Sequence, residues 1–316
     1  MRVLGPGLFC IPAALCLAHA APAQPRHDPA GIVTFQVEND AVSTQSGTTD
    51  RYYTNGLRLG YTTGTTGIPE GLRRFSNAVW GDGLQRVGID LSQSIFTPRN
   101  TQFDPPNPRD RPYAGWLHVD LSLINDRDDS RSVLGLSLGV IGPSAGGRIV
   151  QNGWHDIIGD PPTRGWGYQL QDEPAIQLTA ERTYRLPLAR FGALETDALP
   201  SLTAGVGTVR AYVQAGFNLR LGQGLQSDFG APRIRPGLTG ADGQAVARDV
   251  FLDGSTFRGR TPSVDKKNFL GELQAGLAVM VAGVRVTYTH VWRTEEFRGQ
   301  KAGLFNFGSL ALSARF

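Results

Sequence analysis

The feature that most constrains this chain is an alternation of apolar and polar residues that recurs from residue 31 to the last residue. Alternation with a period of two is the pattern of β-strands that present one apolar face. Twelve segments show it, and each is close to the ~10 residues that a tilted transmembrane strand needs. An even number of strands is typical of single-chain bacterial outer-membrane barrels. The segments are 31–38, 53–63, 86–95, 115–124, 132–141, 174–185, 196–206, 208–221, 248–258, 268–281, 283–293 and 305–316.

The faces of these segments suit a membrane better than a soluble sandwich. In 115–124 one face carries leucine and valine, whereas the other carries His118, Asp120 and Ser122. Inward-facing polar side chains are tolerated by the lumen of a membrane barrel. The chain also ends with an alternating strand closed by Phe316, as outer-membrane barrels do. We therefore predict an all-β fold, a transmembrane antiparallel β-barrel of about 12 strands over residues 31–316, in the outer membrane of a Gram-negative cell.

Residues 1–20 read as a cleaved secretory signal peptide. Arg2 is followed by a short apolar stretch and by the small-x-small site at 18–20. Both cysteines, Cys10 and Cys16, lie in this segment, so disulfides are not expected in the exported chain. We expect residues 21–30 to form a flexible N-terminus. The formal net charge of +3 gives no reason to expect nucleic-acid binding, and we expect a monomer.

With both termini in the periplasm, alternate connections face outwards. Outer loops are usually the longer ones, and the predicted outer loops are 39–52, 96–114, 142–173, a turn near Gly207, 259–267 and 294–304. The long segment 222–247 does not fit this count, because the count assigns it to the periplasm. Within 142–173, apolar residues at helical spacing predict a short helix that ends near Gly159.

His155 is the leading candidate for chemistry. It is the histidine that lies in a long outer loop beside carboxylates, Asp156 and Asp160. An imidazole titrates near neutral pH and can act as a general base. The alternative is an ordinary surface histidine.

A second polar cluster lies in the first outer loop. Glu38, Asn39 and Asp40, together with Asp50 and Thr54, supply oxygen atoms that suit a hard cation such as Ca²⁺. Strand parity places Glu38 and Asp40 on one side and Asn39 on the other. The alternative is a solvated loop rich in turn-forming residues.

Arginines in the outer loops could bind phosphate, because a guanidinium matches phosphate geometry. The candidates for substrate binding are Arg51, Arg99 and Arg148. The alternative is a charge-balanced, solvated rim.

Residues 135–139 fit the G-x-S-x-G motif of serine hydrolases, but Ser137 lies in the middle of a predicted strand instead of at the sharp turn that the motif requires.

Four stretches together resemble the outer-membrane lipid A 3′-O-deacylase family. They are VENDA at 37–41, YYTNGLRLGY at 52–61, GVIGPSAGGRIVQNGWHDIIG at 139–159 and RTEEFRGQ at 293–300. The resemblance implies a twelve-stranded barrel that removes the 3′-linked acyloxyacyl chain of lipid A with the help of Ca²⁺. It places the catalytic residues of the family on His155, Asn39, Asp40 and Thr54.

Two family features are matched less well. A lysine after the third strand has no counterpart in 98–104, where Arg99 is the candidate replacement, and an acidic residue after the histidine is matched only loosely by Asp160.

The mechanism that the resemblance implies is similar to that of a calcium-dependent phospholipase A2. His155 takes a proton from a water molecule that attacks the ester carbonyl, while Ca²⁺, with Asp40 and Glu38 as its candidate ligands, polarises that carbonyl. The partners would be lipid A or lipopolysaccharide and other outer-membrane lipid. Two alternatives stay open: a serine-dependent outer-membrane phospholipase that uses Ser137, and a porin-like barrel with no enzymatic activity.

Overall fold

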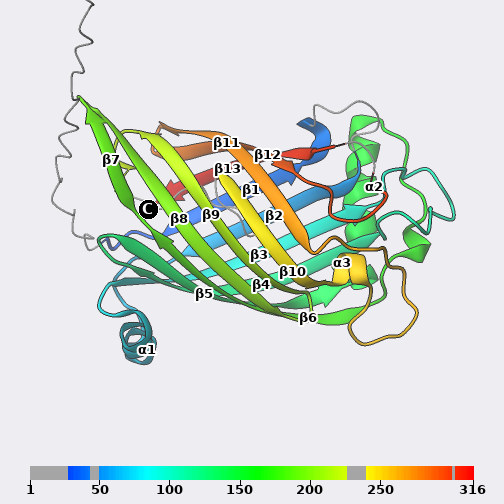
Figure 1. The fold of residues 1–316 in the computed structure, drawn as a ribbon, viewed down its shortest axis with the longest axis horizontal. Helices are drawn as coiled ribbons and strands as arrows, with labels where there is room; N and C mark the ends of the chain where they lie inside the picture. The colour runs from blue at the N-terminus through cyan, green and yellow to red at the C-terminus, as the bar shows by residue number, and fades with distance from the viewer. Residues whose placement is uncertain (1–27, 43–49, 226–239, 301–302) are drawn as a thin grey trace, which may run out of the picture.

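In the computed structural model, which describes residues 28–42, 50–225, 240–300 and 303–316, twelve strands close into one antiparallel barrel (Figure 1). Each barrel strand pairs with its neighbours along the chain, and two further pairings, β1 with β13 and β6 with β8, complete the ring. The predicted fold class and strand number are therefore confirmed. The strands are β1 (Ile32–Asn39), β2 (Tyr52–Thr62), β3 (Leu84–Thr97), β4 (Ala114–Asp126), β5 (Ser130–Ile141), β6 (Glu173–Tyr184), β8 (Leu194–Gly207), β9 (Arg210–Gly222), β10 (Ala241–Asp249), β11 (Phe269–Val281), β12 (Val284–Arg293) and β13 (Phe305–Arg315).

A thirteenth strand, β7 (Leu186–Phe191), pairs with β8 alone, from Leu186↔Ala198 to Phe191↔Leu194. It forms a hairpin that extends beyond the ring at the end of the barrel where the chain termini lie (Figure 1). The alternation pattern did not predict this strand.

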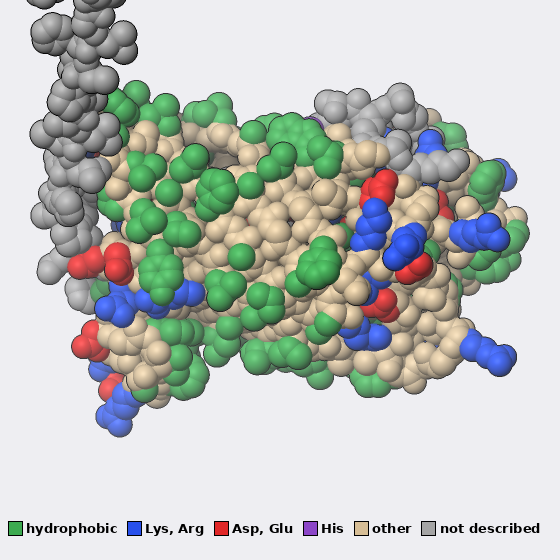
Figure 2. All heavy atoms as spheres, viewed as in Figure 1, with side chains coloured by type: hydrophobic (Ala, Val, Ile, Leu, Met, Phe, Trp, Pro, Cys, Tyr) green, Lys and Arg blue, Asp and Glu red, His purple; other side chains and the backbone are tan. Residues whose placement is uncertain are grey.

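The burial pattern along the strands is inverted relative to a soluble protein. On β1, Phe35 is 46% exposed, whereas Gln36 and Glu38 are fully buried. Alternation sends the apolar residues outwards and the polar residues into the barrel. Figure 2 shows the outward apolar side chains spread over the barrel wall and the charged side chains gathered towards its ends. Apolar residues outside and polar residues inside are the pattern of a barrel surrounded by lipid.

Short helices occupy the connections. They are α1 (Glu70–Trp80), α2 (Gly147–Ile158) and α3 (Val250–Asp253), with 3₁₀ turns η1 (Asp40–Val42), η2 (Pro143–Ala145) and η3 (Trp166–Tyr168). The predicted outer-loop helix is confirmed as α2, and Gly159 ends it in the left-handed conformation with φ of 77°. Among the described residues, every helix is too short or too polar to span a bilayer.

The predicted strand 248–258 is wrong. The strand at this place, β10, covers Ala241–Asp249, and the chain then turns into α3. The cause is local, because the Asp249 side chain accepts a hydrogen bond from the backbone N–H of Phe251 and so caps the helix. The connection that did not fit the strand count is therefore 223–240, of which 226–239 lie outside the described residues.

The predicted signal peptide, residues 1–20, also lies outside the described residues, as do residues 21–27 of the predicted flexible N-terminus. The described part of that segment, 28–30, contacts the barrel. The Asp28 carboxylate forms ion pairs with Arg86 and Arg315, and its backbone N–H donates to the Thr65 hydroxyl at 2.8 Å.

Packed side chains fill the barrel near its long outer loops. Phe251 of α3 stacks on Phe96 with ring centroids 4.1 Å apart, within an apolar cluster to which β2, β3, β12 and β13 also contribute. Beside it, Arg111 and Glu296 form a fully buried ion pair at 2.6 Å. An interior packed in this way does not favour the porin-like alternative, because a porin keeps an aqueous channel open.

Candidate active site on the outer wall of the barrel

A group of polar side chains lies on the outward face of β1, β2 and β3, close to the ends that carry the long outer loops. Asn39 pairs with Asn55, and Asn55 pairs with Ile95, so these three side chains share one face of the sheet. Alternation makes that face the outer one. Between Tyr53 and Asn55 the register shifts, and Thr54 at this bulge places its hydroxyl 2.7 Å from that of Thr97.

Helix α2 covers this face of the wall. Gly147 packs against Gly115 of β4, where a Cβ on Gly147 would lie 3.3 Å from the Gly115 Cα, so the two glycines allow close contact. Val150 of α2 packs on the buried cluster of Ile95, Tyr113 and Trp166. The helix therefore lies on the outside of the barrel, against β3 and β4, and not over its mouth.

The sequence of α2 determines which side chains face the wall. Gly147, Gln151 and His155 are four residues apart and form the buried face of the helix. His155 is only 6% exposed, although it belongs to an outer loop. This burial contradicts the alternative of an ordinary surface histidine.

Both ring nitrogens of His155 have partners. Nδ1 lies 2.7 Å from the backbone oxygen of Pro161, and Nε2 lies 2.6 Å from Oδ2 of Asp50. A carbonyl oxygen can only accept a hydrogen bond, so Nδ1 carries a hydrogen and Nε2 is the nitrogen that can exchange a proton. Gln151 Nε2 donates to the same Asp50 oxygen at 3.1 Å and holds the carboxylate in place.

The segment after α2 is fixed by a second set of hydrogen bonds. Asn152 Oδ1 accepts from the backbone N–H of Thr163 at 2.9 Å and from its hydroxyl at 2.6 Å. Trp166 Nε1 donates to the same hydroxyl at 2.9 Å. These bonds fasten the segment that carries the Pro161 carbonyl, and so they set the orientation of the His155 ring.

Asp40 and Arg51 lie next to this pair in the first outer loop. The backbone N–H of Arg51 donates to Asp40 Oδ2 at 2.7 Å. Asp40 is fully buried, and its Oδ1 has no hydrogen-bond partner among the described residues. Burial, and then the negative charge of Asp50, raise the pKa of Asp40 well above its usual range, although the Arg51 N–H and charge oppose this.

The Arg51 guanidinium is also buried without full compensation. Its side chain is 2% exposed, and Nε and Nη2 lack hydrogen-bond partners among the described residues. Buried guanidinium groups are costly unless they are paired. The site therefore contains both unsatisfied donors and an unsatisfied acceptor, as expected of a place that binds a polar ligand.

The fit of a cation to this site rests on Asp40. The described residues contain no group of three or more His, Cys, Asp or Glu side chains that could hold a metal ion. However, Asp40 Oδ1 is a carboxylate oxygen with no hydrogen-bond partner in the described part of the chain, it lies beside a second carboxylate, and hard cations such as Ca²⁺ bind oxygen atoms of this kind. Asp40 thus fits as one ligand of a calcium ion.

Glu38 lies elsewhere. Its side chain is inside the barrel, where it accepts hydrogen bonds from Gln36 Nε2 at 3.1 Å and from the Tyr53 hydroxyl at 2.7 Å. The barrel wall therefore separates Glu38 from the outward face that carries Asn39, and this placement does not support Glu38 as a ligand of the same ion.

The other predicted residues are exposed to different extents. Asn39 Oδ1 accepts from the backbone N–H of Ala41 at 2.6 Å. Arg99 is half-buried in the connection between β3 and β4, and Arg148 is exposed on α2. Asp160 is exposed, and it contacts His155 through its backbone N–H, which donates to the His155 carbonyl oxygen at 2.9 Å.

Asp50 is the functional residue whose role the sequence did not reveal. It was a candidate cation ligand, but the structure pairs it with His155, more than a hundred residues away. No periodicity or motif links the two positions. Gln151, in contrast, lies one helical turn before His155, so helical spacing alone would have placed it on the same face.

Ser137 lies inside the barrel on β5, away from this site. Its hydroxyl donates to Asp120 Oδ1 at 2.5 Å, while Nε2 of His118 lies 3.2 Å from Asp120 Oδ2. The carboxylate therefore stands between the serine and the imidazole, whereas a nucleophilic serine needs the imidazole as its direct partner. This order does not favour the serine-dependent alternative.

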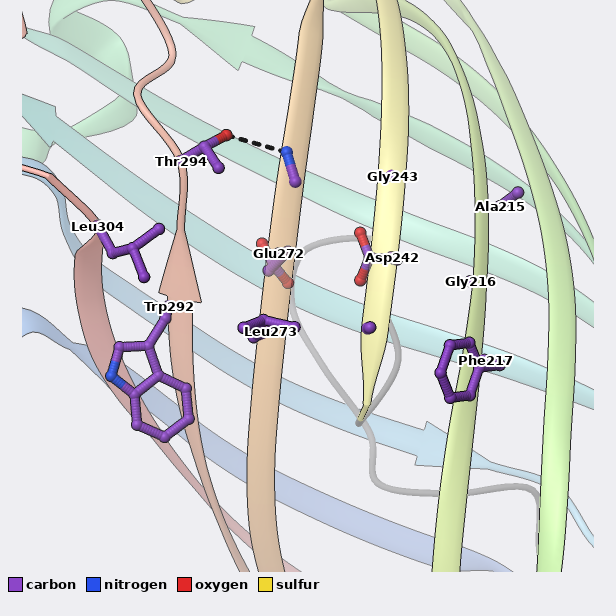
Figure 3. Close-up of a pocket in the computed structure, with 12 residues that line it drawn as sticks. Ala215, Gly216, Phe217, Asp242, Gly243, Glu272, Leu273, Trp292, Thr294 and Leu304 are labelled. Carbon is purple, nitrogen blue, oxygen red and sulfur yellow. Dashed lines mark hydrogen bonds between the residues drawn. The ribbon is translucent and has the colours of Figure 1, made fainter.

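A hollow on another part of the outer wall carries no such groups. It lies over β9–β12, where small residues such as Ala215, Gly243 and Gly271 leave space between Phe217 and Trp292 (Figure 3). The acidic side chains drawn in Figure 3 belong to the interior, since Glu272 is buried against Arg293. The hollow is therefore a depression in the lipid-facing wall and not a reaction site.

Comparison with known proteins identifies the family. The family model described as "Outer membrane protein LpxR" matches residues 8–316. No curated protein matches the chain.

Among solved structures, LpxR from Salmonella typhimurium superposes with a TM-score of 0.72 at 22% identity, over 90% of this chain and 100% of that one. The β domain of the Bordetella autotransporter BrkA is similar at a TM-score of 0.40 and 12% identity, over 91% and 98% of the two chains. The first of these likenesses supports the twelve-stranded barrel, and the family match covers nearly the whole sequence. The chain therefore belongs to the LpxR family of outer membrane proteins.

Proposed function

We propose that this protein hydrolyses the 3′-linked acyloxyacyl ester of lipid A at the outer face of the outer membrane. Family membership supports this assignment, and so does the position of the site. The observation that carries the proposal is the buried His155–Asp50 pair, held by α2 against the outward face of the wall. A proton-accepting group at that place faces lipid and not an aqueous lumen.

The wall next to the site offers a path for a lipid substrate. From Asn55 and Ile95, the outward rows of β2 and β3 continue through Leu59, which is 56% exposed, and Leu91, which is 51% exposed. Acyl chains can lie along this apolar surface while the sugar headgroup stays at the level of the loops. An ester in the outer leaflet would then reach His155 sideways, with no polar group drawn through the barrel.

The chemistry follows from the two ring nitrogens. A water molecule enters between His155 Nε2 and the Asp50 carboxylate, Nε2 takes a proton from it, and its oxygen attacks the ester carbonyl. The charge of Asp50, whose carboxylate lies 2.6 Å from Nε2 before the water enters, stabilises the imidazolium that forms. When the tetrahedral intermediate collapses, the C–O bond to the sugar breaks and the imidazolium returns the proton to the leaving oxygen. The products are a free fatty acid and a sugar hydroxyl, with no acyl-enzyme.

The negative charge on the carbonyl oxygen needs a donor during this step. Nε and Nη2 of Arg51, which have no hydrogen-bond partner among the described residues, are buried donors next to the pair, and Asn39 and Thr54 supply further polar groups on the same wall. Preorganised donors of this kind stabilise an oxyanion strongly in a water-poor site. Arg148 is exposed on α2 and Arg99 is half-buried between β3 and β4, and both would contact phosphate groups of the lipid headgroup.

We also propose that the active protein uses Ca²⁺ and that Asp40 is one of its ligands. A bound calcium ion would polarise the ester carbonyl as a Lewis acid. The remaining ligands would be backbone oxygens, water and the substrate.

The calcium proposal predicts a change in thermal stability for Asp40→Asn. Folding raises the pKa of the Asp40 carboxyl above its usual value of 3.8. Asp40 therefore contributes stability that is full below pH 3.8 and is lost as the pH rises through the pKa of the folded protein. At neutral pH in chelator, the uncharged asparagine should therefore make the variant more stable than the wild type. A ligand at a hundred times its Kd stabilises by about 2.7 kcal/mol, or roughly 5 °C for a chain of this size. Calcium should raise the wild-type unfolding temperature by about this amount and leave that of Asp40→Asn unchanged.

Asp160→Asn is the matched control, because Asp160 is exposed and should keep the full calcium response. An equal response in Asp40→Asn and the wild type would remove Asp40 from the ligand set.

The proposed reaction is tested by mass spectrometry of lipid A incubated with the purified barrel in detergent. We expect the loss of one acyloxyacyl group and the appearance of the matching free acid, and we expect a chelator to stop both. Lipid A of unchanged mass, from a barrel that is folded and supplied with calcium, would contradict the proposed activity.

A further inference from the structure

Helix α1 lies on the outside of the barrel wall, at the end where the chain termini lie. Ser76 of the helix is fully buried and accepts a hydrogen bond from Asn125 Nδ2 at 2.8 Å. Asn77 accepts one from Gln85 Nε2 at 2.7 Å. Gln85 and Asn125 pair across β3 and β4, and alternation places both on the outward face, which further along these strands carries Ile89.

The two exposed sides of α1 differ in character. Leu72, Phe75 and Val79 are 40%, 46% and 55% exposed, and their spacing of three and four residues places them on one flank. The opposite flank carries Glu70, which forms ion pairs with Arg73 and Arg74. The helix is therefore amphipathic, and the described residues leave its apolar flank exposed.

The axis of α1 runs across the long axis of the barrel. In Figure 1 the barrel lies horizontally and α1 is seen almost end-on, below and outside the wall. Since a barrel stands along the membrane normal, α1 lies in the plane of the membrane.

The position of α1 along the wall corresponds to the edge of the apolar band. The α1 contact at Gln85 and the α2 contact at Ile95 are ten residues apart on β3. Ten residues extend about 33 Å along a strand, and a tilt of about 40° reduces this to about 25 Å along the barrel axis, which is the usual height of the lipid-facing band. The two helices thus lie at the two edges of the membrane.

We propose that α1 is an interfacial helix whose apolar flank, Leu72, Phe75 and Val79, inserts among the acyl chains of the inner-leaflet phospholipids. The flank is continuous with the lipid-facing wall, where Ile89 is 49% exposed and Leu121 is 41% exposed. Amphipathic helices in the plane of the interface bury their apolar face at the boundary between headgroups and acyl chains. Trp80, which contacts Phe75 edge-on at 6.5 Å between ring centroids, adds an aromatic ring of the kind enriched at membrane interfaces.

The test compares the two flanks of α1 with single thiol probes. In the full chain with Cys10 and Cys16 replaced by serine, Phe75→Cys and Arg74→Cys are each labelled with an environment-sensitive fluorophore. Leu121→Cys on the membrane wall serves as the reference for hydrocarbon. Each protein is reconstituted into vesicles of phosphatidylethanolamine and phosphatidylglycerol, so that both leaflets have the same composition. Folding of every sample is checked by the mobility difference between heated and unheated barrel on a gel.

We expect the label at position 75 to show a blue-shifted emission like that at position 121 and to be quenched by nitroxide lipids. The label at position 74 should be quenched by aqueous iodide. If the labels at 75 and 74 are equally accessible to iodide in folded samples, α1 does not insert, and its apolar flank faces water or a protein partner. This result is independent of the proposed deacylation, because it requires no turnover.

Discussion

Replacing His155 with alanine is expected to lower the rate of lipid A deacylation by about 10²- to 10⁴-fold, the range that a positioned general base contributes. His155 is the imidazole whose Nε2 can take the proton from water, because its Nδ1 hydrogen is held by the Pro161 carbonyl. Neither side chain that contacts it in the described structure can replace it, since the Asp50 carboxylate is already engaged by His155 and Gln151 and an amide such as Gln151 does not titrate. The measurement is the rate at which the mass of lipid A falls by one acyloxyacyl group.

The loss must come from chemistry and not from misfolding. His155 sits on the outer wall, away from the strand pairings, so the variant should still assemble and show the same heat-dependent gel mobility as the wild type. A matched control is His290→Phe, which removes an imidazole from β12, a strand separated from β1 by β13, and should retain activity. Turnover by a folded His155→Ala protein at the wild-type rate would exclude the proposed mechanism.

Replacing Asp50 with asparagine is the second large effect, with an expected fall in kcat on the order of 10²-fold, the scale for removing one charged group from a preorganised site. Asparagine keeps the shape and can still hydrogen-bond to Nε2. It cannot stabilise an imidazolium by charge, so the fall should appear in kcat and leave KM nearly unchanged. Initial rates over a range of lipid A concentrations in mixed micelles separate the two constants.

Asp156→Asn provides the comparison for Asp50→Asn, because Asp156 neighbours His155 in the sequence but points to solvent from α2. It should leave both constants unchanged. If Asp50→Asn instead raised KM alone, Asp50 would serve in substrate binding, and the proposed support of the imidazolium would be wrong.

The sequence determined the barrel because the signal that encodes a lipid-facing strand is local. Each apolar residue that alternates with a polar one reports the side of the wall on which it lies, and the pattern survives wherever the strand spans the membrane. It failed at 248–258, where Asp249 accepts a hydrogen bond from Phe251 N–H and starts α3. It also missed α1 and β7, since neither spans the membrane and neither therefore has to follow that alternation.

Part of the site was also open to sequence reasoning. Parity placed Asn39 and Glu38 on opposite faces of β1, and the structure has Asn39 outside and Glu38 inside. Helical spacing predicted α2 and its end at Gly159. The family resemblance then singled out His155 among the five histidines.

The tertiary structure decided what His155 can do. Whether α2 would lie over the mouth of the barrel or on its outer wall depended on the contact between Gly147 and Gly115, two residues without side chains that alternation does not distinguish from any others. The partnership of His155 with Asp50 depended on α2 packing back over β3 and β4, which brings the third outer loop to the first. Alternation and helical spacing are set by neighbours along the chain and can be read from it, whereas a contact between distant loops exists only once the strands between them have paired and α2 has packed on them.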